Sequence, residues 1–281
     1  MAIIMSGKEM SAALMEEQKA QVAEMKRQGL QPGLAVVLVG EDPASQIYVR
    51  NKGQACEDAG IYSRTIRLDN SVTEEKLLST IDELNADDKI HGILIQLPLP
   101  KHLNEGVILG HVMPEKDVDG FHVVNAGKLF TAQHGVIPCT PKGILYMLKK
   151  AEVPLSGKHA VIVGRSNIVG KPAAMLLLNE NCTVTICHSR TEDLPSVIRQ
   201  ADILVAAVGK PHFITADMVK PGAAVIDVGI NRVDGHVVGD VDFINVEKVA
   251  GWITPVPGGV GKMTISMLLQ NTLEAACRQA R

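Results

Sequence analysis

The stretch Val161-Ile-Val-Gly164-Arg-Ser-Asn-Ile-Val-Gly170-Lys-Pro172 is the most informative part of this chain for its architecture. Its apolar, β-branched start predicts a buried parallel strand, Gly164 predicts a tight turn, and the residues from Gly170 onward predict a helix. At such a turn the free backbone N–H groups and the helix dipole favour an anion. The stretch therefore predicts a βα unit that binds a phosphate group, with an ordinary glycine turn as the alternative.

This turn matches only part of the G-x-G-x-x-G fingerprint with which α/β folds bind the pyrophosphate of a dinucleotide. Gly164 takes the first glycine position, Ser166 replaces the second, Val169 replaces the third, and Gly170 comes one residue later. We therefore expect Gly164 and Ser166 to contact a dinucleotide cofactor.

The end of the next expected strand bears on which dinucleotide binds. An enzyme that uses NAD usually carries an acidic residue there to hold the ribose 2′-hydroxyl, but the first acid in this stretch is Glu192. Ser189 and Arg190, together with Arg165 on the first turn, offer charge-assisted hydrogen bonds to a 2′-phosphate instead. The sequence thus predicts NADP as the cofactor.

On both sides of this unit, strands and helices alternate, which predicts βαβ crossovers and mostly parallel sheets. The expected strands are 34–39, 61–68, 92–97, 159–163, 182–187, 203–208 and 223–228. The expected helices are about 7–28, 44–59, 73–85, 141–151, 170–179, 194–200 and 260–281. Between 98 and 140 the regular pattern breaks down, and we expect a long irregular region of the kind that is usually functional.

This organisation predicts an α/β protein with two α/β domains and a cleft between them. The first domain is expected over residues 1–140, with the C-terminal helix 260–281 packing back on it. The second, a Rossmann-type dinucleotide-binding domain, is expected over residues 141–259.

Composition excludes several classes of function. The 281 residues are 46% apolar and only 3% aromatic, with a net charge of −3, so we expect neither nucleic-acid binding nor a basic membrane-binding face. Five cysteines without a CxxC pair predict reduced thiols rather than disulfides or a metal site. Because no signal peptide or membrane-length apolar run is present, we expect a cytoplasmic protein.

Candidate catalytic side chains occur in the first half of the chain. Tyr48 and Lys52 lie four residues apart, on one face of an expected helix. A half-buried tyrosine beside a lysine with a purely packing role is the alternative. The same Tyr-x3-Lys spacing marks short-chain dehydrogenases, but there the pair follows the dinucleotide turn, whereas here it precedes Gly164. That assignment is therefore disfavoured.

Gln96 and Asp119 are two further candidate polar side chains. Gln96 ends the expected strand 92–97, and the carboxyl ends of buried parallel strands are where α/β sheets bind ligands. Asp119 belongs to Lys116-Asp-Val-Asp-Gly120, which is either a functional acidic loop or a solvated turn. The glycine-rich stretch before the last helix is not a phosphate-binding P-loop, because Val256 replaces a required glycine and Met263 follows Lys262.

Taken together, these and other motifs occur in the order typical of one enzyme family. They are Tyr48-x3-Lys52, Gln96-Leu-Pro-Leu-Pro100, Lys116-Asp-Val-Asp119-Gly, Pro138-Cys-Thr-Pro141, the turn at Gly164, Cys187-His-Ser-Arg-Thr191, Asp227-Val-Gly-Ile230-Asn and Pro255-Val-Pro-Gly-Gly-Val-Gly261. Over essentially its full length the chain resembles the bifunctional methylenetetrahydrofolate dehydrogenase/cyclohydrolase (FolD) family. One position departs from the family pattern PGGVGPMT, since Lys262 replaces its proline.

The resemblance implies two activities. The first is oxidation of 5,10-methylenetetrahydrofolate with NADP⁺, and the second is hydrolysis of the methenyl product to 10-formyltetrahydrofolate. It implies that Lys52 exchanges protons in the hydrolysis, that Gln96 hydrogen-bonds Lys52, and that Tyr48 packs on the folate ring and orients Lys52. Asp119 is expected to accept hydrogen bonds from the pterin edge.

The resemblance also places residues around both ligands and implies a homodimer. Pro257 and Gly258 are expected to line the folate pocket through their backbone, and Ile230 is expected to contact the cofactor. Two alternatives stay open on sequence alone: a different NADP oxidoreductase on the same two-domain plan, and a non-catalytic dinucleotide-binding module.

Overall fold

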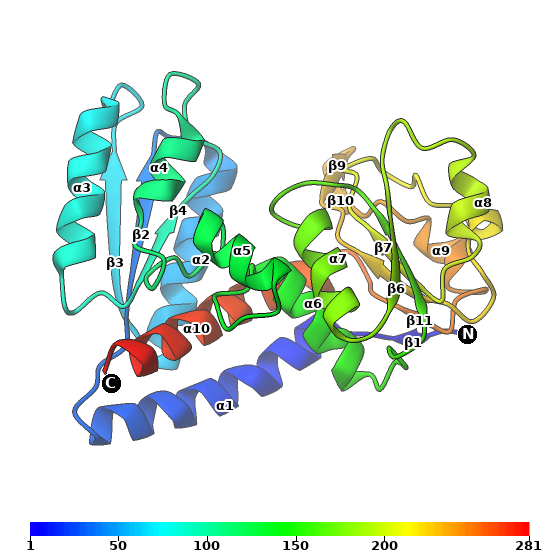
Figure 1. The fold of residues 1–281 in the computed structure, drawn as a ribbon, viewed down its shortest axis with the longest axis horizontal. Coiled ribbons are helices and arrows are strands. Elements are labelled where there is room, and N and C mark those ends of the chain that lie inside the picture. The colour runs from blue at the N-terminus through cyan, green and yellow to red at the C-terminus, as the bar shows by residue number, and fades with distance from the viewer. Residues whose placement is uncertain (281) are drawn as a thin grey trace. The chain divides into compact units, whose positions relative to one another are not determined.

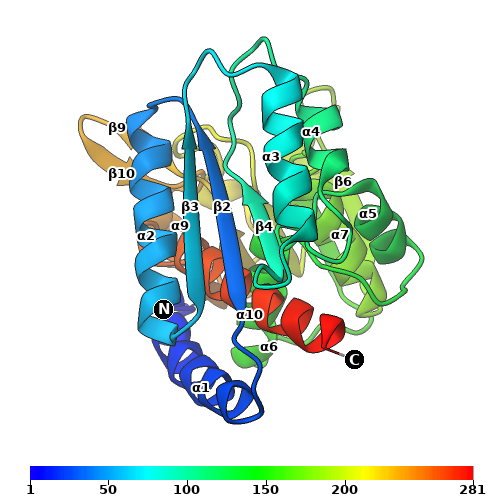
Figure 2. The ribbon, with the colours of Figure 1, turned by 90° about the vertical axis from the view of Figure 1, so that its left-hand side faces the viewer.

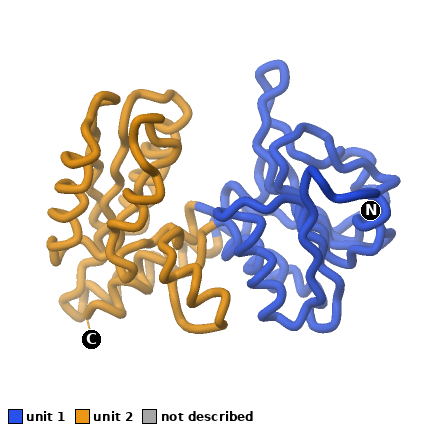
Figure 3. Tube along the Cα trace, turned by 45° about the horizontal axis from the view of Figure 1, so that its top comes forward, with its two compact units in different colours: residues 1–12, 140–264 blue, residues 13–139, 265–281 orange. Residues whose placement is uncertain are grey.

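The computed structural model describes residues 1–280, which form two compact units (Figures 1 and 3). Unit 1 consists of residues 1–12 and 140–264, and unit 2 consists of residues 13–139 and 265–280. The sequence predicts that the N-terminal residues belong with the first half of the chain. Instead, residues 1–12 group with 140–264, because β1 (Ile3–Ile4) pairs in parallel with β11 (Trp252–Ile253).

Unit 1 is built on a six-stranded sheet in which every pairing is parallel. The strand order is β1, β11, β8 (Ala224–Asp227), β7 (Ile203–Ala206), β5 (His159–Val163) and β6 (Thr183–Cys187). The central strands β7 and β8 are buried along their whole length. Burial on both faces explains why these strands consist almost entirely of apolar residues.

Several short elements complete unit 1. They are α7 (Gly170–Asn179), α8 (Leu194–Ile198), the 3₁₀ helix η1 (Ala216–Met218), the antiparallel pair β9 (Asn231–Val233) and β10 (His236–Val238), and α9 (Phe243–Val246). The sequence predicts α7 and α8 but not η1, β9, β10 or α9, because elements this short lack a measurable hydrophobic period.

Unit 2 contains a three-stranded parallel sheet in the order β3 (Tyr62–Leu68), β2 (Gly33–Val39) and β4 (Gly92–Ile95). Helix α3 (Glu74–Ala86) packs against one face of this sheet, where its apolar residues join alternate residues of β2 in a single core. Helix α2 (Pro43–Ala59) lies on the opposite face (Figures 1 and 2). A βαβ unit thus holds α2 beside the carboxyl ends of the strands.

Local capping explains where α2 begins and ends. The Asp42 carboxylate accepts a hydrogen bond from the Ser45 backbone N–H at 2.7 Å, and Pro43 occupies the first turn. Gly60 ends the helix in the left-handed conformation, with φ of 79°. The sequence therefore fixes the length of the helix that carries Tyr48 and Lys52.

The region between residues 98 and 140 is more regular than the sequence predicts. It contains α4 (Glu105–His111) and α5 (Val123–Phe130). Asn104 caps α4 by accepting from two backbone N–H groups, and the His122 ring caps α5 by accepting from Val124. Helices of seven and eight residues show too little periodicity for the sequence pattern to reveal them.

The three remaining helices are α1 (Gly7–Arg27), α6 (Cys139–Lys150) and α10 (Val260–Gln279). At the start of α1, the Ser6 hydroxyl accepts a hydrogen bond from the Glu9 backbone N–H at 3.3 Å, as the Ser-x-x-Glu pattern predicts. Among residues 1–280, no helix has both the length and the apolar character that crossing a membrane requires.

Candidate active site and cofactor site

Lys52 and Gln96 form a hydrogen-bonded pair in unit 2. Lys52 lies on the sheet-facing side of α2 and is only 9% exposed. Its Nζ donates to Gln96 Oε1 at 3.0 Å. Gln96 directly follows β4, and its own Nε2 donates to the Leu97 carbonyl at 2.7 Å, so its oxygen is left to face the lysine. The structure thus contains the hydrogen bond that the sequence predicts.

Tyr48 lies one helical turn before Lys52 and, in contrast, keeps its ring accessible. The residue is 40% exposed, whereas its neighbour Val49 is buried. An accessible aromatic ring beside a buried amine can provide a flat apolar surface for a heterocyclic ligand.

Asp119 lies in a loop whose shape is fixed by another acid, Asp117. The Asp117 carboxylate accepts hydrogen bonds from a run of backbone N–H groups and from one side chain. These donors are Gly120, Phe121 and His122 at 3.1, 3.2 and 2.9 Å and Asn125 Nδ2 at 2.8 Å. Asp117 belongs to the motif Lys116-Asp-Val-Asp-Gly120, but the sequence predicts no role for it, because a carboxylate that holds a loop looks the same in sequence as one that holds a ligand.

The electrostatic surroundings of Asp119 connect it to Lys52. Burial raises the pKa of Asp119, and the nearby Asp117 carboxylate raises it further, while the Lys52 ammonium and a hydrogen bond from the Cys139 thiol act in the opposite direction. Lys52 and Cys139 therefore each lie within interaction range of Asp119. Cys139 belongs to the motif Pro138-Cys-Thr-Pro141, but the sequence alone predicts no role for it.

The two other expected folate contacts belong to unit 1. Pro257 and Gly258 lie in the loop before α10, where Gly258 has φ of 103° and its carbonyl accepts from the Lys8 N–H at 2.9 Å. Lys262, which departs from the family pattern, is exposed in the first turn of α10.

A pocket of about 270 Å³ opens at the carboxyl ends of β5, β6 and β7 in unit 1. It is lined by Val163, Gly164, Arg165, His188, Ser189, Leu194, Ala207, Val208, Lys210 and Phe213. Three of the expected cofactor residues, Gly164, Arg165 and Ser189, therefore meet in one pocket. Lys210 and Phe213 also line the pocket, but the sequence does not predict them, because no local motif marks the segment after β7.

The turn in this pocket requires its glycines. Gly164 has φ of 131°, and a Cβ there would overlap the Ala207 carbonyl, while a Cβ on Gly170 would overlap the Gly164 carbonyl. Ser166 closes the same turn, since its Oγ accepts from the N–H groups of Val169 and Gly170 at 3.1 and 3.3 Å. The serine that replaces a fingerprint glycine therefore caps α7.

Ser166, Arg190 and Ile230 are the expected cofactor residues that do not line this pocket. The Arg190 backbone N–H donates to His188 Nδ1 at 3.2 Å. Arg190 is therefore hydrogen-bonded to a residue that lines the pocket. Ile230 is 53% exposed, just before β9.

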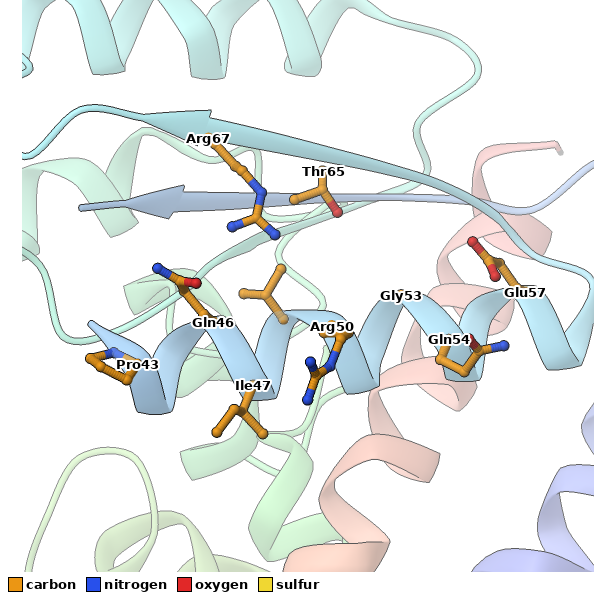
Figure 4. A pocket seen from close by; sticks show the side chains of 10 residues that line it. Pro43, Gln46, Ile47, Arg50, Gly53, Gln54, Glu57, Thr65 and Arg67 are labelled. Atoms are coloured by element: carbon orange, nitrogen blue, oxygen red, sulfur yellow. The ribbon is translucent and has the colours of Figure 1, made fainter. Parts of the chain in front are cut away.

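A second groove, of about 540 Å³, lies in unit 2 on the side of α2 that faces β3. Figure 4 shows Thr65 and Arg67 extending from β3 toward α2, with Gln46 and Glu57 on the helix. None of the predicted site residues lines this groove.

Comparison with known proteins identifies the family. Residues 5–119 match the profile of the tetrahydrofolate dehydrogenase/cyclohydrolase catalytic domain, and residues 138–280 match that of the NAD(P)-binding domain of the same family. The chain belongs to the tetrahydrofolate dehydrogenase/cyclohydrolase family. The resemblance inferred from the motifs is confirmed, as is the α/β fold class.

Individual members of this family match over nearly the whole chain. The bifunctional protein FolD of Bacillus cytotoxicus is 55% identical over 278 residues, which cover 99% of this chain and 97% of that protein. The FolD crystal structure from Campylobacter jejuni has a TM-score of 0.98 at 49% identity and 99% coverage of both chains. A Trypanosoma brucei FolD structure, complexed with NADP cofactor and inhibitor, has a TM-score of 0.95 at 39% identity, covering 100% of this chain and 99% of that one.

This enzyme is therefore a dehydrogenase/cyclohydrolase of folate one-carbon metabolism, with a catalytic and an NAD(P)-binding domain. Family membership favours this assignment over both alternatives, the unrelated NADP oxidoreductase and the non-catalytic module.

Proposed function

We propose that this enzyme catalyses two successive reactions on one folate. In the first, 5,10-methylenetetrahydrofolate and NADP⁺ give 5,10-methenyltetrahydrofolate and NADPH. In the second, the methenyl cation and water give 10-formyltetrahydrofolate and a proton. The observation that carries the proposal is the buried Lys52–Gln96 hydrogen bond within interaction range of Asp119, in a chain of this family.

In the dehydrogenase step, the protein mainly has to bind and orient. When bound, NADP⁺ supplies the hydride acceptor for the bridging carbon of the folate. Neither a metal nor a covalent nucleophile is needed, because the folate nitrogen lone pairs assist departure of the hydride. Asp119 would hold the pterin edge by accepting hydrogen bonds from N3–H and the 2-amino group, and Tyr48 would pack on the ring. Pro257 and Gly258 are proposed as further backbone contacts.

In the cyclohydrolase step, Lys52 would handle protons. As a neutral amine it would accept a proton from the water that attacks the methenyl carbon, and as an ammonium it would return a proton to the folate nitrogen when the ring opens. The hydrogen bond to Gln96 fixes Nζ in place for both transfers. Burial of Lys52 supports this role, because lysine is rarely buried unless it is paired, and the partner here is Gln96, at the carboxyl end of a strand.

The residues of the unit 1 pocket suit NADP. Gly164 allows close approach of a pyrophosphate to the backbone, and Ser166 holds the turn. Arg165 and Ser189 line the pocket and can bind a 2′-phosphate, and the strand end carries no acid that would prefer a 2′-hydroxyl. We propose NADP as the preferred cofactor, with Arg190 and Ile230 as additional contacts. NAD matching NADP in kcat/KM would contradict this preference.

In this proposal unit 2 supplies the side chains Tyr48, Lys52, Gln96 and Asp119, and unit 1 binds NADP. We also propose that the enzyme is a homodimer, which the mass of the particle in solution would test directly.

The decisive experiment follows methenyltetrahydrofolate by its absorbance. With methylenetetrahydrofolate and NADP⁺ present, the signal should rise and then decay when enzyme is in excess. An enzyme that neither forms nor consumes methenyltetrahydrofolate would refute the proposed function.

A further inference from the structure

Two buried carboxylates in unit 1 have no part in the chemistry proposed above. Asp227 is the last residue of β8 and is 3% exposed, and Asp240, between β10 and α9, is fully buried. A buried carboxylate is costly unless hydrogen-bond donors surround it. The donors around these two acids therefore indicate what they hold in place.

Asp240 holds the segment that follows β7. Its Oδ2 accepts hydrogen bonds from the backbone N–H groups of Val208 and Gly209 at 2.7 and 2.9 Å. Its Oδ1 accepts from the Lys210 backbone N–H and from Asn231 Nδ2, both at 2.9 Å. Three consecutive backbone amides thus converge on one side chain, and both carboxylate oxygens accept two bonds each.

Asp227 in turn holds Asp240. Asp227 Oδ1 accepts from the backbone N–H groups of Gly229 and Asp240, and its Oδ2 accepts from that of Val241, all at 2.9 Å. The backbone N–H of Asp227 donates to Thr254 Oγ1 at 2.8 Å. A continuous series of hydrogen bonds therefore runs from the buried strand β8, through Asp227 and the backbone of Asp240, to the segment 208–210.

The segment held by Asp240 is one wall of the cofactor pocket. Val208 and Lys210 line the pocket together with Phe213, and Lys210 Nζ lies 5.4 Å from the centre of the Phe213 ring. Arg165 and Ser189, the expected contacts of a 2′-phosphate, line the same pocket. The wall is thus placed to bind the adenosine end of a dinucleotide.

We propose that Asp240, anchored by Asp227, is a positioning residue for the cofactor: it fixes the segment 208–210 in the conformation that binds the adenosine end of NADP. The inference rests on the proposed function of the pocket. Loss of this positioning should weaken the dehydrogenase activity and spare the cyclohydrolase activity, because hydrolysis of the methenyl folate needs no dinucleotide.

The variant Asp240→Asn tests the proposal. Asparagine keeps the shape but has one acceptor oxygen, so its NH₂ group faces two N–H donors. We expect the dissociation constant of NADP to rise by about tenfold or more, as expected for two lost hydrogen bonds. At saturating NADP, kcat of the dehydrogenase should return to within about twofold of the parent, because positioning acts through affinity. Cyclohydrolase activity should equal that of the parent.

Asp242→Asn is the matched control, since it makes the same change two residues away. The Asp242 carboxylate accepts from Asn245 Nδ2, and Asp242 does not line the pocket, so this variant should bind NADP like the parent. Should Asp240→Asn fail to fold, Asn231→Ala removes a single donor from Asp240 and should weaken NADP binding about two- to fivefold.

The proposal is overturned if Asp240→Asn binds NADP with parental affinity, or if it loses kcat in a way that saturating NADP does not restore. If Asp240→Asn does not fold, parental NADP affinity in Asn231→Ala overturns it. Failure of the parent enzyme itself to bind NADP would instead refute the proposed function of the pocket.

Discussion

The two candidate sites use polar groups in different ways. In unit 2 the central group, Lys52, is buried and has a specific partner in Gln96. In unit 1 the expected phosphate-binding side chains, Arg165 and Ser189, are exposed, and the buried residue that lines the pocket, Val163, is apolar. A buried ionisable group interacts strongly and is expensive to disturb, whereas an exposed one is screened by water. Substitutions in unit 2 should therefore cost more than substitutions of exposed residues in unit 1.

The largest effect is expected for Lys52→Met. Removing the amine eliminates general acid–base catalysis, which is worth about 10²- to 10⁴-fold, from the cyclohydrolase step. NADP affinity should stay at the parental value. The rate of methenyltetrahydrofolate decay measures the effect, with Lys76→Met, an exposed lysine on α3, as the control. Hydrolysis at the parental rate would show that Lys52 has no role in proton transfer.

Asp119→Ala should have the next largest effect. Loss of a carboxylate that accepts hydrogen bonds from the pterin should weaken folate binding by about 1.5–3 kcal/mol. Titration with a folate ligand measures the change, and Asp88→Ala, an exposed acid in the same unit, provides the control. Equal folate affinity in the Asp119 variant and the parent would show that Asp119 does not bind the pterin.

Asp227 is a buried ionisable group in unit 1, so it tests whether burial, rather than the unit, makes a substitution costly. Burial raises its pKa from 3.8 to about 6, although hydrogen bonds from the Asp240, Val241 and Gly229 backbone act against the shift. The folded protein therefore binds this proton more tightly than the unfolded chain. The resulting stabilisation is complete below the unfolded value of 3.8 and is lost as the pH rises through about 6.

The corresponding measurement compares the parent with Asp227→Asn by urea unfolding at several pH values. Relative to the variant, the parent should lose about 2 kcal/mol of unfolding free energy between about pH 4 and pH 7. The neighbouring acid Asp240 contributes to the shift. Asp242→Asn keeps both acids, so this control should retain the loss of unfolding free energy that Asp227 causes. A difference between parent and Asp227→Asn that stays constant with pH would contradict the raised pKa.

The smallest effect is expected for Arg165→Ala. Because this arginine is exposed, its attraction to a 2′-phosphate is screened and should be worth about 1 kcal/mol, or roughly fivefold in KM for NADP. KM for NAD should not change, since NAD has no 2′-phosphate. Arg199→Ala, an exposed arginine that does not line the pocket, is the control. An equal rise in KM for NADP and for NAD would show that Arg165 does not bind the 2′-phosphate.

The sequence by itself determined the elements that local chemistry specifies. Asp42, Pro43 and Gly60 set the ends of α2, and the apolar runs gave the main strands of both sheets. The pairing of Lys52 with Gln96 was expected only from the resemblance to the family, and the structure contains that hydrogen bond. The turn from Gly164 to Gly170 could be predicted since its residues are neighbours in the chain.

Only the tertiary structure decided the features that depend on distant segments. The pairing of β1 with β11, the loop around Asp119 that Asp117 holds, and the wall of the cofactor pocket that Asp240 holds are examples. The physical reason is that a carboxylate looks the same in sequence whether water, a ligand or a remote backbone amide satisfies it. The tertiary structure determines which of these partners a carboxylate has, because a buried charge without hydrogen-bond donors would destabilise the fold.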